Sequence, residues 1–309
     1  MEENFIVSSP PYIRSNNSIR KVMIHVIIAL FPITISAIWF YGIRALLVML
    51  ITTGSAVAFE YIWNILLRKE QSIGDFSAVV SGMMLALVLP VSIPLWIPVF
   101  GSLFMIIIVK MFFGGLGQNF LNPALTARAF LLASWPAYMT IYVKPFSGIS
   151  SVDAISTATP LGDVNSLGGA FEFFLQPHLG CMGEVYIPAI IIGFIYLVAC
   201  RVISWHATVG YVLSAYVLAA IFGSNPLIEV MSGGIIFASV FMVTDYTTTP
   251  TTKSGRLLFG IGTGLITMLI RYKGGYPEGV TYAILLMNIL VPYIEKVCKP
   301  VPFGKKVHR

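Results

Sequence analysis

Charged residues are scarce in this sequence: Asp, Glu, Lys and Arg make up only 10% of its 309 residues. Soluble domains carry about 25%, so the composition excludes an ordinary water-soluble globular protein. Hydrophobic residues reach 57% and the mean hydropathy is +0.86, which indicates that lipid replaces water as the main solvent. The net charge of +6 comes mostly from Lys and Arg that flank apolar segments, so we expect a membrane protein and no nucleic-acid partner.

Motifs for metal and nucleotide chemistry are also missing. Cys181, Cys200 and Cys298 are isolated, without Cys-x-x-Cys spacing, which argues against an iron–sulfur cluster or a zinc site. The four histidines have no helical metal-ligand spacing, and no phosphate loop of the G-x-x-x-x-G-K type occurs. We therefore expect no metal site in this chain. The first ~20 residues are polar and do not resemble a cleavable signal peptide.

Apolar runs dominate what is present. A run of about 20 residues crosses a ~30 Å hydrocarbon core as a helix. Asn122 followed by Pro123 is typical of an N-cap and the first turn of a helix, and predicts where the short fifth crossing begins. We predict ten crossings, at residues 21–41, 43–67, 76–93, 95–113, 123–135, 185–203, 207–222, 231–244, 255–270 and 279–297.

The two halves of this pattern resemble each other. Ser81-Gly82 and Ser232-Gly233 each begin a crossing, and Gly114-Gly115 and Gly274-Gly275 each follow the next one. The pattern predicts an all-α polytopic membrane protein with two five-helix repeats, at residues 1–135 and 185–309, separated by an outer loop at 136–184. The repeats would be inverted because five is odd, which favours a binding site at their interface. The alternative is that Gly and Pro are simply common in membrane helices.

The distribution of basic residues predicts the orientation. With ten crossings, 15 Lys and Arg residues lie on the side of the two termini and 4 on the other side, which accounts for all 19. The side of Arg128 is arguable, but the bias survives without it. The positive-inside rule then predicts an inner (cytoplasmic) membrane protein with both termini cytoplasmic and residues 136–184 outside.

The longest polar interval contains Asp153-Ala154-Ile155-Ser156-Thr157-Ala158-Thr159-Pro160-Leu161. One interpretation is an ordinary hydroxylated loop. The other rests on a resemblance to the [Ser/Thr]-x-Ala-Thr flavinylation motif of the membrane subunits of Rnf and Na⁺-translocating NADH:quinone reductase complexes. That resemblance implies that a flavin transferase joins FMN through its phosphate to Thr159.

The other residues of this loop would serve the same attachment. Ser156 and Thr157 could hydrogen-bond the phosphate, and Ala158 completes the motif. We expect Asp153 to be recognised by the Mg²⁺-dependent transferase and not to contact the attached flavin. The Asp153 carboxylate and the flavin phosphate are both anions, and two anions repel each other. Thr157 stands where many relatives have Gly, a departure that remains within the range of the motif.

Three further blocks resemble the NqrB/RnfD family in the same order: residues 114–130, residues 243–250 with Gly255-Arg256, and residues 276–280 with 285–288. The chain lacks the longer amino-terminal extension of the NqrB branch, so it is most similar to the RnfD branch of the family. The resemblance implies transfer of electrons from reduced ferredoxin to NAD⁺ with outward movement of Na⁺ or H⁺. It also implies partner subunits of the A, B, C, E and G types, and no catalysis by this chain alone. Members can also hold a non-covalent riboflavin, which no motif here places.

Several polar residues within or beside the crossings are candidates for the flavin cavity. Arg128 either lines that cavity or extends to the membrane interface. Asn119, Asn122 and Thr126 are further candidates, although Asn122 is already explained as an N-cap.

The carboxylates Glu60, Asp75 and Asp245 lie near the ends of crossings and are candidates for an ion path. The alternative for each is a solvated helix end or a cap. Two other readings of the whole chain compete with the redox one. Composition and topology fit a passive solute channel of the urea-channel kind equally well, and a purely structural membrane anchor is the third reading.

Overall fold

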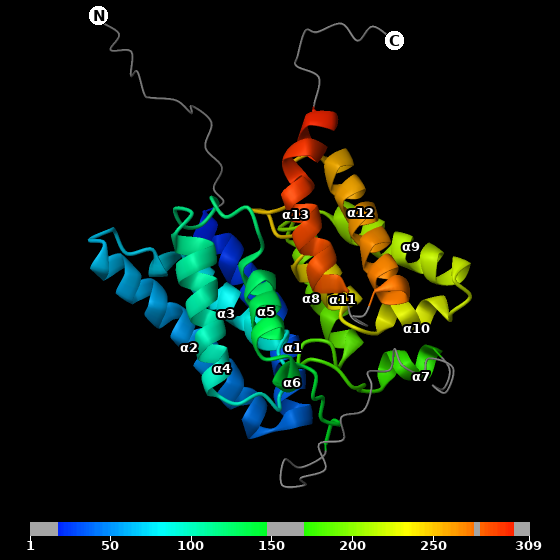
Figure 1. Ribbon diagram of the computed structural model, residues 1–309, viewed down its shortest axis with the longest axis horizontal. Helices are drawn as coiled ribbons and strands as arrows, with labels where there is room; N and C mark the ends of the chain where they lie inside the picture. Colours follow the sequence, from blue (N-terminus) through cyan, green and yellow to red (C-terminus); the bar gives the residue numbers. More distant parts are fainter. Residues whose placement is uncertain (1–17, 147–169, 275–278, 300–309) are drawn as a thin grey trace, which may run out of the picture.

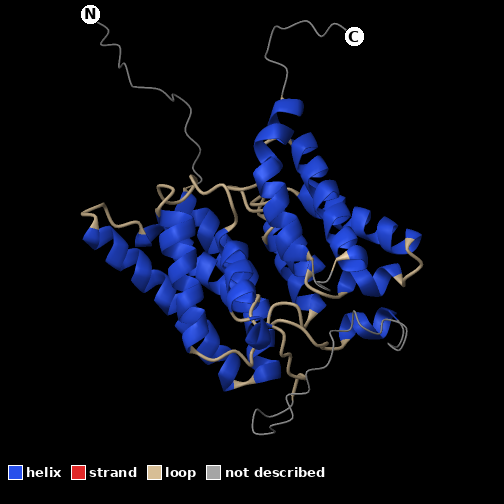
Figure 2. Ribbon diagram, viewed as in Figure 1, coloured by secondary structure: helices blue, strands red, loops and turns tan. Residues whose placement is uncertain are grey.

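The computed structural model describes residues 18–146, 170–274 and 279–299, and within these ranges it contains helices and loops but no strands (Figure 2). Asn122 caps the fifth predicted crossing by accepting from the backbone N–H of Leu125 at 3.2 Å, and Pro123 is the first helical residue, as predicted. The first half contains α1 Ile19–Tyr41, α2 Ile43–Leu66, η1 Ile73–Asp75, α3 Ser77–Leu87, α4 Trp96–Leu103, η2 Phe104–Met111, α5 Pro123–Ser134 and α6 Pro136–Met139. The remainder contains α7 Ala170–Leu175, α8 Ile187–Ala199, α9 Trp205–Ile221, α10 Pro226–Met231, α11 Ile235–Phe241, α12 Lys253–Lys273 and α13 Val280–Val297.

Each of the ten predicted crossings contains a helix, but their lengths differ from the prediction. Within the described ranges, only α1, α2 and α13 are both long and apolar enough to cross a membrane alone. The third predicted crossing, 76–93, contains only the 11 residues of α3, and the eighth, 231–244, only the 7 residues of α11. These helices rise about 16 and 10 Å, well short of a bilayer core. Residues after α3 and before α11 form irregular backbone instead.

Helices that are far apart in the sequence pack together (Figure 1). In the first half, α2 packs against α3 and α4, and in the second half α9 packs against α12. The halves meet where α1 packs against α8 and where α5 packs against α13. The core therefore lies between two helical groups, and residues from both groups line the space at their junction.

Small residues bring helices of each contact close together. A Cβ added to Gly260 of α12 would lie 2.2 Å from the carbonyl oxygen of Ala207 in α9. A Cβ on Gly193 of α8 would lie 2.6 Å from the carbonyl oxygen of Ala29 in α1. Close backbone approach through small residues is how helices associate in lipid, where no hydrophobic effect drives them together.

The outer surface is apolar. Trp39, Leu50, Ile192 and Leu213 have exposed fractions of 75%, 60%, 57% and 59%. A water-soluble monomer rarely exposes apolar surface so widely. Together with three long apolar helices, this surface is that of a membrane protein.

Candidate functional site

The predicted flavin segment lies outside the described residues, and with it Asp153, Ser156, Thr157, Ala158 and Thr159. The described chain leaves off at Phe146, shortly after α6, and resumes at Ala170, the first residue of α7. Both helices lie at the end of the molecule away from the start of α1 and the end of α13 (Figure 1). The assignment of FMN to Thr159 therefore stays a prediction.

A buried cation lies at the centre of the polar interior of the first half. Lys110, in the last turn of the π-helical segment η2, is 2% exposed. Its Nζ lies 2.6 Å from Oε2 of Glu60 and 2.6 Å from Oγ of Ser77, and Glu60 is fully buried. Ser72 donates to the second oxygen of the Glu60 carboxylate. Glu60 is thus a paired, buried carboxylate and not a solvated helix end; its place in an ion path stays a prediction.

Asp75 is joined to the same cluster through Ser77. Its Oδ1 accepts from the backbone N–H of Ser77 at 2.7 Å and from the hydroxyl at 2.6 Å. Phe76 between them has φ 62°, the left-handed region that a bulky residue rarely adopts. This turn directs the Asp75 carboxylate to the first residue of α3, so it stabilises the start of that helix, the alternative considered for it.

Asp245 forms a second polar junction, in the loop after α11. Its Oδ2 accepts from the hydroxyls of Thr247 at 3.1 Å and Thr248 at 3.2 Å, and from Nδ2 of Asn122 at 3.4 Å. Asn119 donates to Thr247 at 3.4 Å. Burial raises the pKa of the Asp245 carboxyl above its usual range, although the hydrogen bonds from Thr247 and Thr248 act in the opposite direction. Two predicted flavin residues, Asn119 and Asn122, therefore meet a predicted ion-path residue.

The last helix completes this junction. With its side-chain amide oriented to match its neighbours, Asn288 of α13 donates to the carbonyl of Thr248 at 3.3 Å and accepts from the backbone N–H of Asn122 at 3.2 Å. The loop before α5, the loop after α11 and α13 are thus held together by amide and hydroxyl groups.

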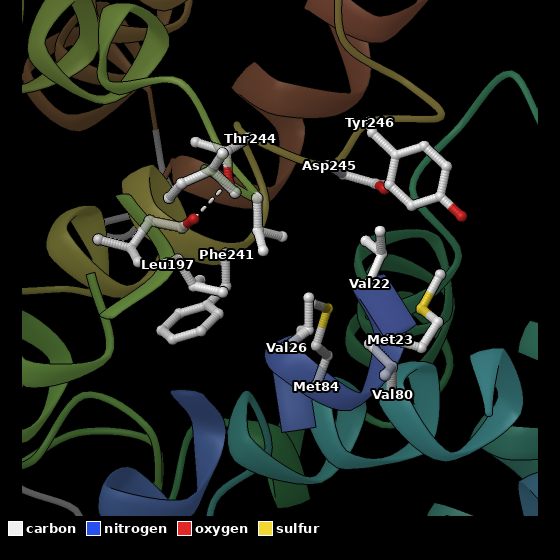
Figure 3. A pocket seen from close by; sticks show the side chains of 13 residues that line it. Val22, Met23, Val26, Val80, Met84, Leu197, Phe241, Thr244, Asp245 and Tyr246 are labelled. Carbon is white, nitrogen blue, oxygen red and sulfur yellow. Dashed lines mark hydrogen bonds between the residues drawn. The ribbon is translucent and has the colours of Figure 1, made fainter. Parts of the chain in front are cut away.

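Two adjacent cavities of about 50 Å³ each open beside these groups. One is lined by apolar side chains of α1, α3, α8 and α11, with Asp245 and Tyr246 at its edge (Figure 3). The other, called the polar cavity below, is lined by the polar side chains of Lys110, Asn119, Asn122, Asp245 and Thr247 among apolar ones such as Leu116 and Pro123. Met23, Val80, Met84 and Asp245 line both.

One polar atom at this site has no partner. Asn119 is 4% exposed and lines the polar cavity, and its Oδ1 is buried without a hydrogen bond. An unpaired buried acceptor costs roughly 1–3 kcal/mol. Such an atom is explained if a hydrogen-bond donor of a ligand meets it.

The other predicted site residues lie further along α5. Thr126 donates to the carbonyl of Asn122 within the helix at 2.8 Å, a local bond that points to no ligand. Arg128 is 5% exposed and lies 3.8 Å from Oε1 of Glu184, just before α8. Arg128 is therefore a buried, paired arginine and does not extend to the membrane interface; its role beside a flavin stays a prediction.

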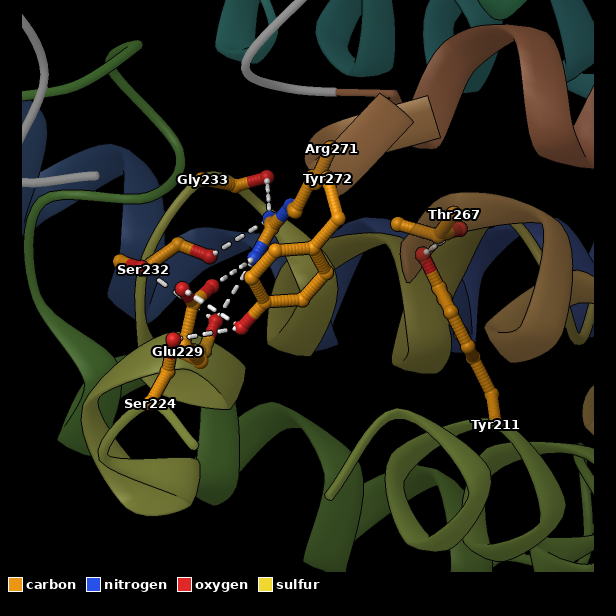
Figure 4. Close-up of polar contacts among 8 residues, drawn as sticks. All are labelled: Tyr211, Ser224, Glu229, Ser232, Gly233, Thr267, Arg271 and Tyr272. Atoms are coloured by element: carbon orange, nitrogen blue, oxygen red, sulfur yellow. Dashed lines mark hydrogen bonds and ion pairs between the residues drawn. The ribbon is translucent and has the colours of Figure 1, made fainter. Parts of the chain in front are cut away.

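A buried cation of the second half was missed by sequence reasoning. Arg271, near the end of α12, donates to Oε2 of Glu229 at 3.2 Å and to the carbonyls of Glu229, Ser232 and Gly233 at 2.8, 3.0 and 3.1 Å (Figure 4). The guanidinium therefore donates hydrogen bonds to the backbone carbonyls at the break between α10 and α11.

Lys110 was missed too, although a signal existed. It falls inside the predicted crossing 95–113, and an ionisable residue at such a position is a functional candidate by default. Its partner could not be found by spacing, because Glu60 is 50 residues away. Within the described part of the chain, no group of three His, Cys, Asp or Glu side chains is arranged to hold a metal ion.

Comparison with known proteins shows the family of this chain. The model of the NQR2, RnfD, RnfE family matches residues 6–304. The chain belongs to this family. It is 44% identical to the D subunit of the Na(+)-translocating ferredoxin:NAD(+) oxidoreductase complex of Acetobacterium woodii, over 98% of this chain and 96% of that protein.

Two other relatives match this chain over nearly its full length at lower identity. The D subunit of the proton-translocating ferredoxin:NAD(+) oxidoreductase complex of Clostridium ljungdahlii is 38% identical over 98% of this chain and 97% of that protein. The D subunit of the ion-translocating oxidoreductase complex of Stutzerimonas stutzeri is 36% identical over 94% and 93%. The resemblance to this family that the motifs carry is thereby confirmed along nearly the whole chain.

Proposed function

We propose that this chain is the membrane-embedded D-type component of an Rnf complex, which transfers electrons between ferredoxin and NAD⁺ and moves Na⁺ or H⁺ across the bacterial cytoplasmic membrane. The observation that carries the proposal is the similarity over almost the full length of two relatives named as D subunits of ferredoxin:NAD(+) oxidoreductase complexes, and of a third named as the D subunit of an ion-translocating oxidoreductase complex. The chain is not catalytic alone. Ferredoxin, NAD⁺ and iron–sulfur centres are assigned to partner subunits of the A, B, C, E and G types.

The proposed architecture is two inverted five-helix repeats, at 1–135 and 185–309. Three observations support it. Corresponding helices meet across the halves, α1 with α8 and α5 with α13. The third and eighth crossings are both short. Each half has a buried ion pair that joins the helix of its fourth crossing to a glutamate in, or shortly after, the helix of its second: Lys110 with Glu60, and Arg271 with Glu229.

The proposed orientation has both termini in the cytoplasm and the 136–184 interval outside. The loops after α2 and η2 lie on the same side of the molecule as the start of α1 and the end of α13, whereas α6 and α7 lie on the opposite side (Figure 1). The charge bias supports this assignment. It puts the Lys110 cluster near the cytoplasmic face and the Thr159 segment outside, where the flavin transferase would reach it.

The first proposed cofactor is FMN, esterified to Thr159. Its support is the motif formed by Ser156, Thr157, Ala158 and Thr159, with Asp153 as a recognition element for the transferase. The hydroxyl of Thr159 would form the phosphoester.

The second is a non-covalent riboflavin at the two cavities. An isoalloxazine has one edge of carbonyl and N–H groups and one apolar dimethylbenzene edge. The polar cavity offers Asn119, Asn122 and Thr247 to the first edge, and the apolar cavity suits the second. The unpaired Oδ1 of Asn119 fits a flavin N–H. Each cavity, at about 50 Å³, is smaller than the isoalloxazine ring system, so binding would join the two by displacing Met23 and Met84, whose unbranched, adaptable side chains line both. When bound, the flavin would supply one-electron and two-electron chemistry.

Intact-mass measurement of this chain from the native complex tests the proposal. We expect an excess of one FMN that disappears in Thr159→Ala, together with the fluorescence of the denatured band. Thr251→Ala, in the other threonine-rich loop, should keep both. An unmodified wild-type chain from a host that makes the transferase would favour the passive channel. Normal electron transfer by Thr159→Ala would favour a structural anchor.

A further inference from the structure

Three carboxylates identified from the sequence as ion-path candidates lie around one lysine, Lys110. Lys110 contacts Glu60 directly, reaches Asp75 through the hydroxyl of Ser77, and lines the same cavity as Asp245. Burial of Tyr246 and the carboxylates of Asp245 and Asp75 raise the pKa of Tyr246 to about 12, a sign that the two aspartates lie near the same ring. The lysine therefore stands between an enclosed carboxylate and a cavity.

The oxygen atoms around Lys110 are those that a small cation would use. They are a carboxylate oxygen of Glu60 and the hydroxyl of Ser77, each 2.6 Å from Nζ. The ammonium fills this position as a tethered cation, so a mobile cation is excluded while it stays. A single carboxylate with neutral oxygens is also a weak site, which suits an ion in transit.

The corresponding pair of the second half is built differently. Arg271 donates to the side-chain carboxylate of Glu229 and also to three backbone carbonyls, those of Glu229, Ser232 and Gly233. Lys110 has two side-chain partners and a flexible four-carbon stem. It also lies in a π-helical segment, a feature frequent at functional sites. Only the lysine of the two cations lines one of the two cavities described here.

The geometry points to Lys110 as a movable counter-charge that couples the charge in the polar cavity to cation binding at Glu60. This inference rests on the proposed binding of a flavin in that cavity. When an electron delivered by the partner subunits adds negative charge there, the ammonium turns from Glu60 toward the cavity. One Na⁺ or H⁺ then binds the Glu60 carboxylate. One electron and one cation enter, so the net charge of the region is unchanged. Reoxidation draws the ammonium back to Glu60 and expels the cation.

The test is a redox titration of the non-covalent flavin in the full-length chain carrying Thr159→Ala, so that no covalent FMN contributes. For one electron linked to one cation at Glu60, the midpoint potential should rise by about 59 mV per tenfold increase in Na⁺ concentration. A reduced flavin also takes up protons itself, so for H⁺ the expected result is an additional rise of about 59 mV per unit decrease in pH over that of the Lys110→Met variant. Lys110→Met should remove the Na⁺ dependence, or this additional H⁺ dependence, because Glu60 then binds the cation in both redox states. Glu60→Gln should remove it as well. Lys110→Arg keeps the charge and should keep the dependence.

A second measurement needs no flavin. With Lys110 replaced by Met, raising Na⁺ at constant ionic strength, or lowering the pH within the range above ~6.5 where histidines are neutral, should increase the unfolding temperature of the flavin-free chain. Wild type and Lys253→Met, which removes an exposed lysine, should not respond. If Lys110→Met does not fold, Glu60→Gln against Lys110→Arg decides. An unaltered dependence in Lys110→Met or Glu60→Gln, or none in wild type, would overturn the inference with riboflavin still bound. A chain that extracts without riboflavin would overturn the cavity assignment and this inference together.

Discussion

Two of the buried ion pairs, Lys110 with Glu60 and Arg271 with Glu229, occupy corresponding places in the two halves but hold their cations differently. Arg271 is bonded to a carboxylate and to the carbonyls left open where α10 ends before α11. Lys110 is bonded to a carboxylate and one hydroxyl beside a cavity. The planar, five-donor guanidinium suits a fixed structural position, and the ammonium suits a position that changes. One architecture can thus carry a fixed charge in one half and a responsive one in the other.

Arg271→Met should have the largest effect on stability. It leaves the Glu229 carboxylate in the interior without a cation, although the Tyr272 hydroxyl still donates to it, and this costs about 3–5 kcal/mol. It also leaves the carbonyls of Ser232 and Gly233 without a donor, at about 1–3 kcal/mol each if neither finds water, whereas the Glu229 carbonyl keeps the Ser232 hydroxyl. We expect little folded protein by size-exclusion chromatography in detergent. The exposed Lys253→Met is the control. A variant as stable as wild type would mean that the guanidinium does not hold the α10–α11 break.

Lys110→Met should cost about 3–5 kcal/mol, because Glu60 is left buried without its partner. The double variant Glu60→Gln/Lys110→Met should recover most of that loss, since both charges disappear together. The corresponding Glu229→Gln/Arg271→Met should recover less, because the carbonyls of Ser232 and Gly233 remain without a donor. Thermal unfolding in detergent compares the four variants. Equal recovery in both halves would contradict the difference drawn between the pairs.

A pH titration tests a region apart from these two ion pairs, on the face of the molecule that carries α6 and α7. His178 is 8% exposed, stacks on Phe173, and has no partner for either ring nitrogen. Burial lowers its pKa to about 4. Because the folded pKa lies below the unfolded value of about 6.5, stability is full above pH ~6.5 and falls until pH ~4, by roughly 3 kcal/mol. His178→Phe should reduce this acid sensitivity in thermal unfolding, and an unchanged profile would assign it to other groups.

The smallest effect distinguishes a cap from a ligand contact. Asn122 caps α5, and Thr252 caps α12 by accepting from the backbone N–H of Gly255 at 3.1 Å. Alanine at either position should cost about 1 kcal/mol. Asn122→Ala should in addition lower the riboflavin content of the purified chain, and Thr252→Ala should not. Equal flavin content in both variants would leave Asn122 as a cap alone.

Local signals predicted much of the fold because they depend on neighbours in the sequence. Asn122-Pro123 marked the start of α5 to the residue, and the apolar run after Ile43 marked α2 to within one residue of its end. The predicted lengths of the crossings that contain α3 and α11 were wrong, because hydropathy cannot distinguish a helix from buried irregular backbone. Arg271 holds such backbone before α11, and the backbone N–H groups of Met182 and Gly183 hold it at the end of α3.

The candidate site was predicted as separate residues and not as one place. Asn119, Asn122, Glu60, Asp75 and Asp245 were all identified, but as members of two unrelated groups. Lys110 connects the two groups. It contacts Glu60, 50 residues away, and Ser77, 33 residues away, and it lines the same cavity as Asp245 and the two asparagines. No sequence spacing encodes such a contact, because it depends on how α2, α3 and η2 pack.

Composition alone indicated lipid as the solvent of this protein, because a chain with so few charged residues has too little polar surface for water. The helix starts and the family followed from short motifs, whose capping bonds and blocks of matching residues are local. Only the tertiary structure decided which buried charge meets which. A buried cation is tolerable only beside the few oxygens that the packing of distant helices brings within reach, and that packing placed Lys110 on Glu60 and Arg271 on Glu229.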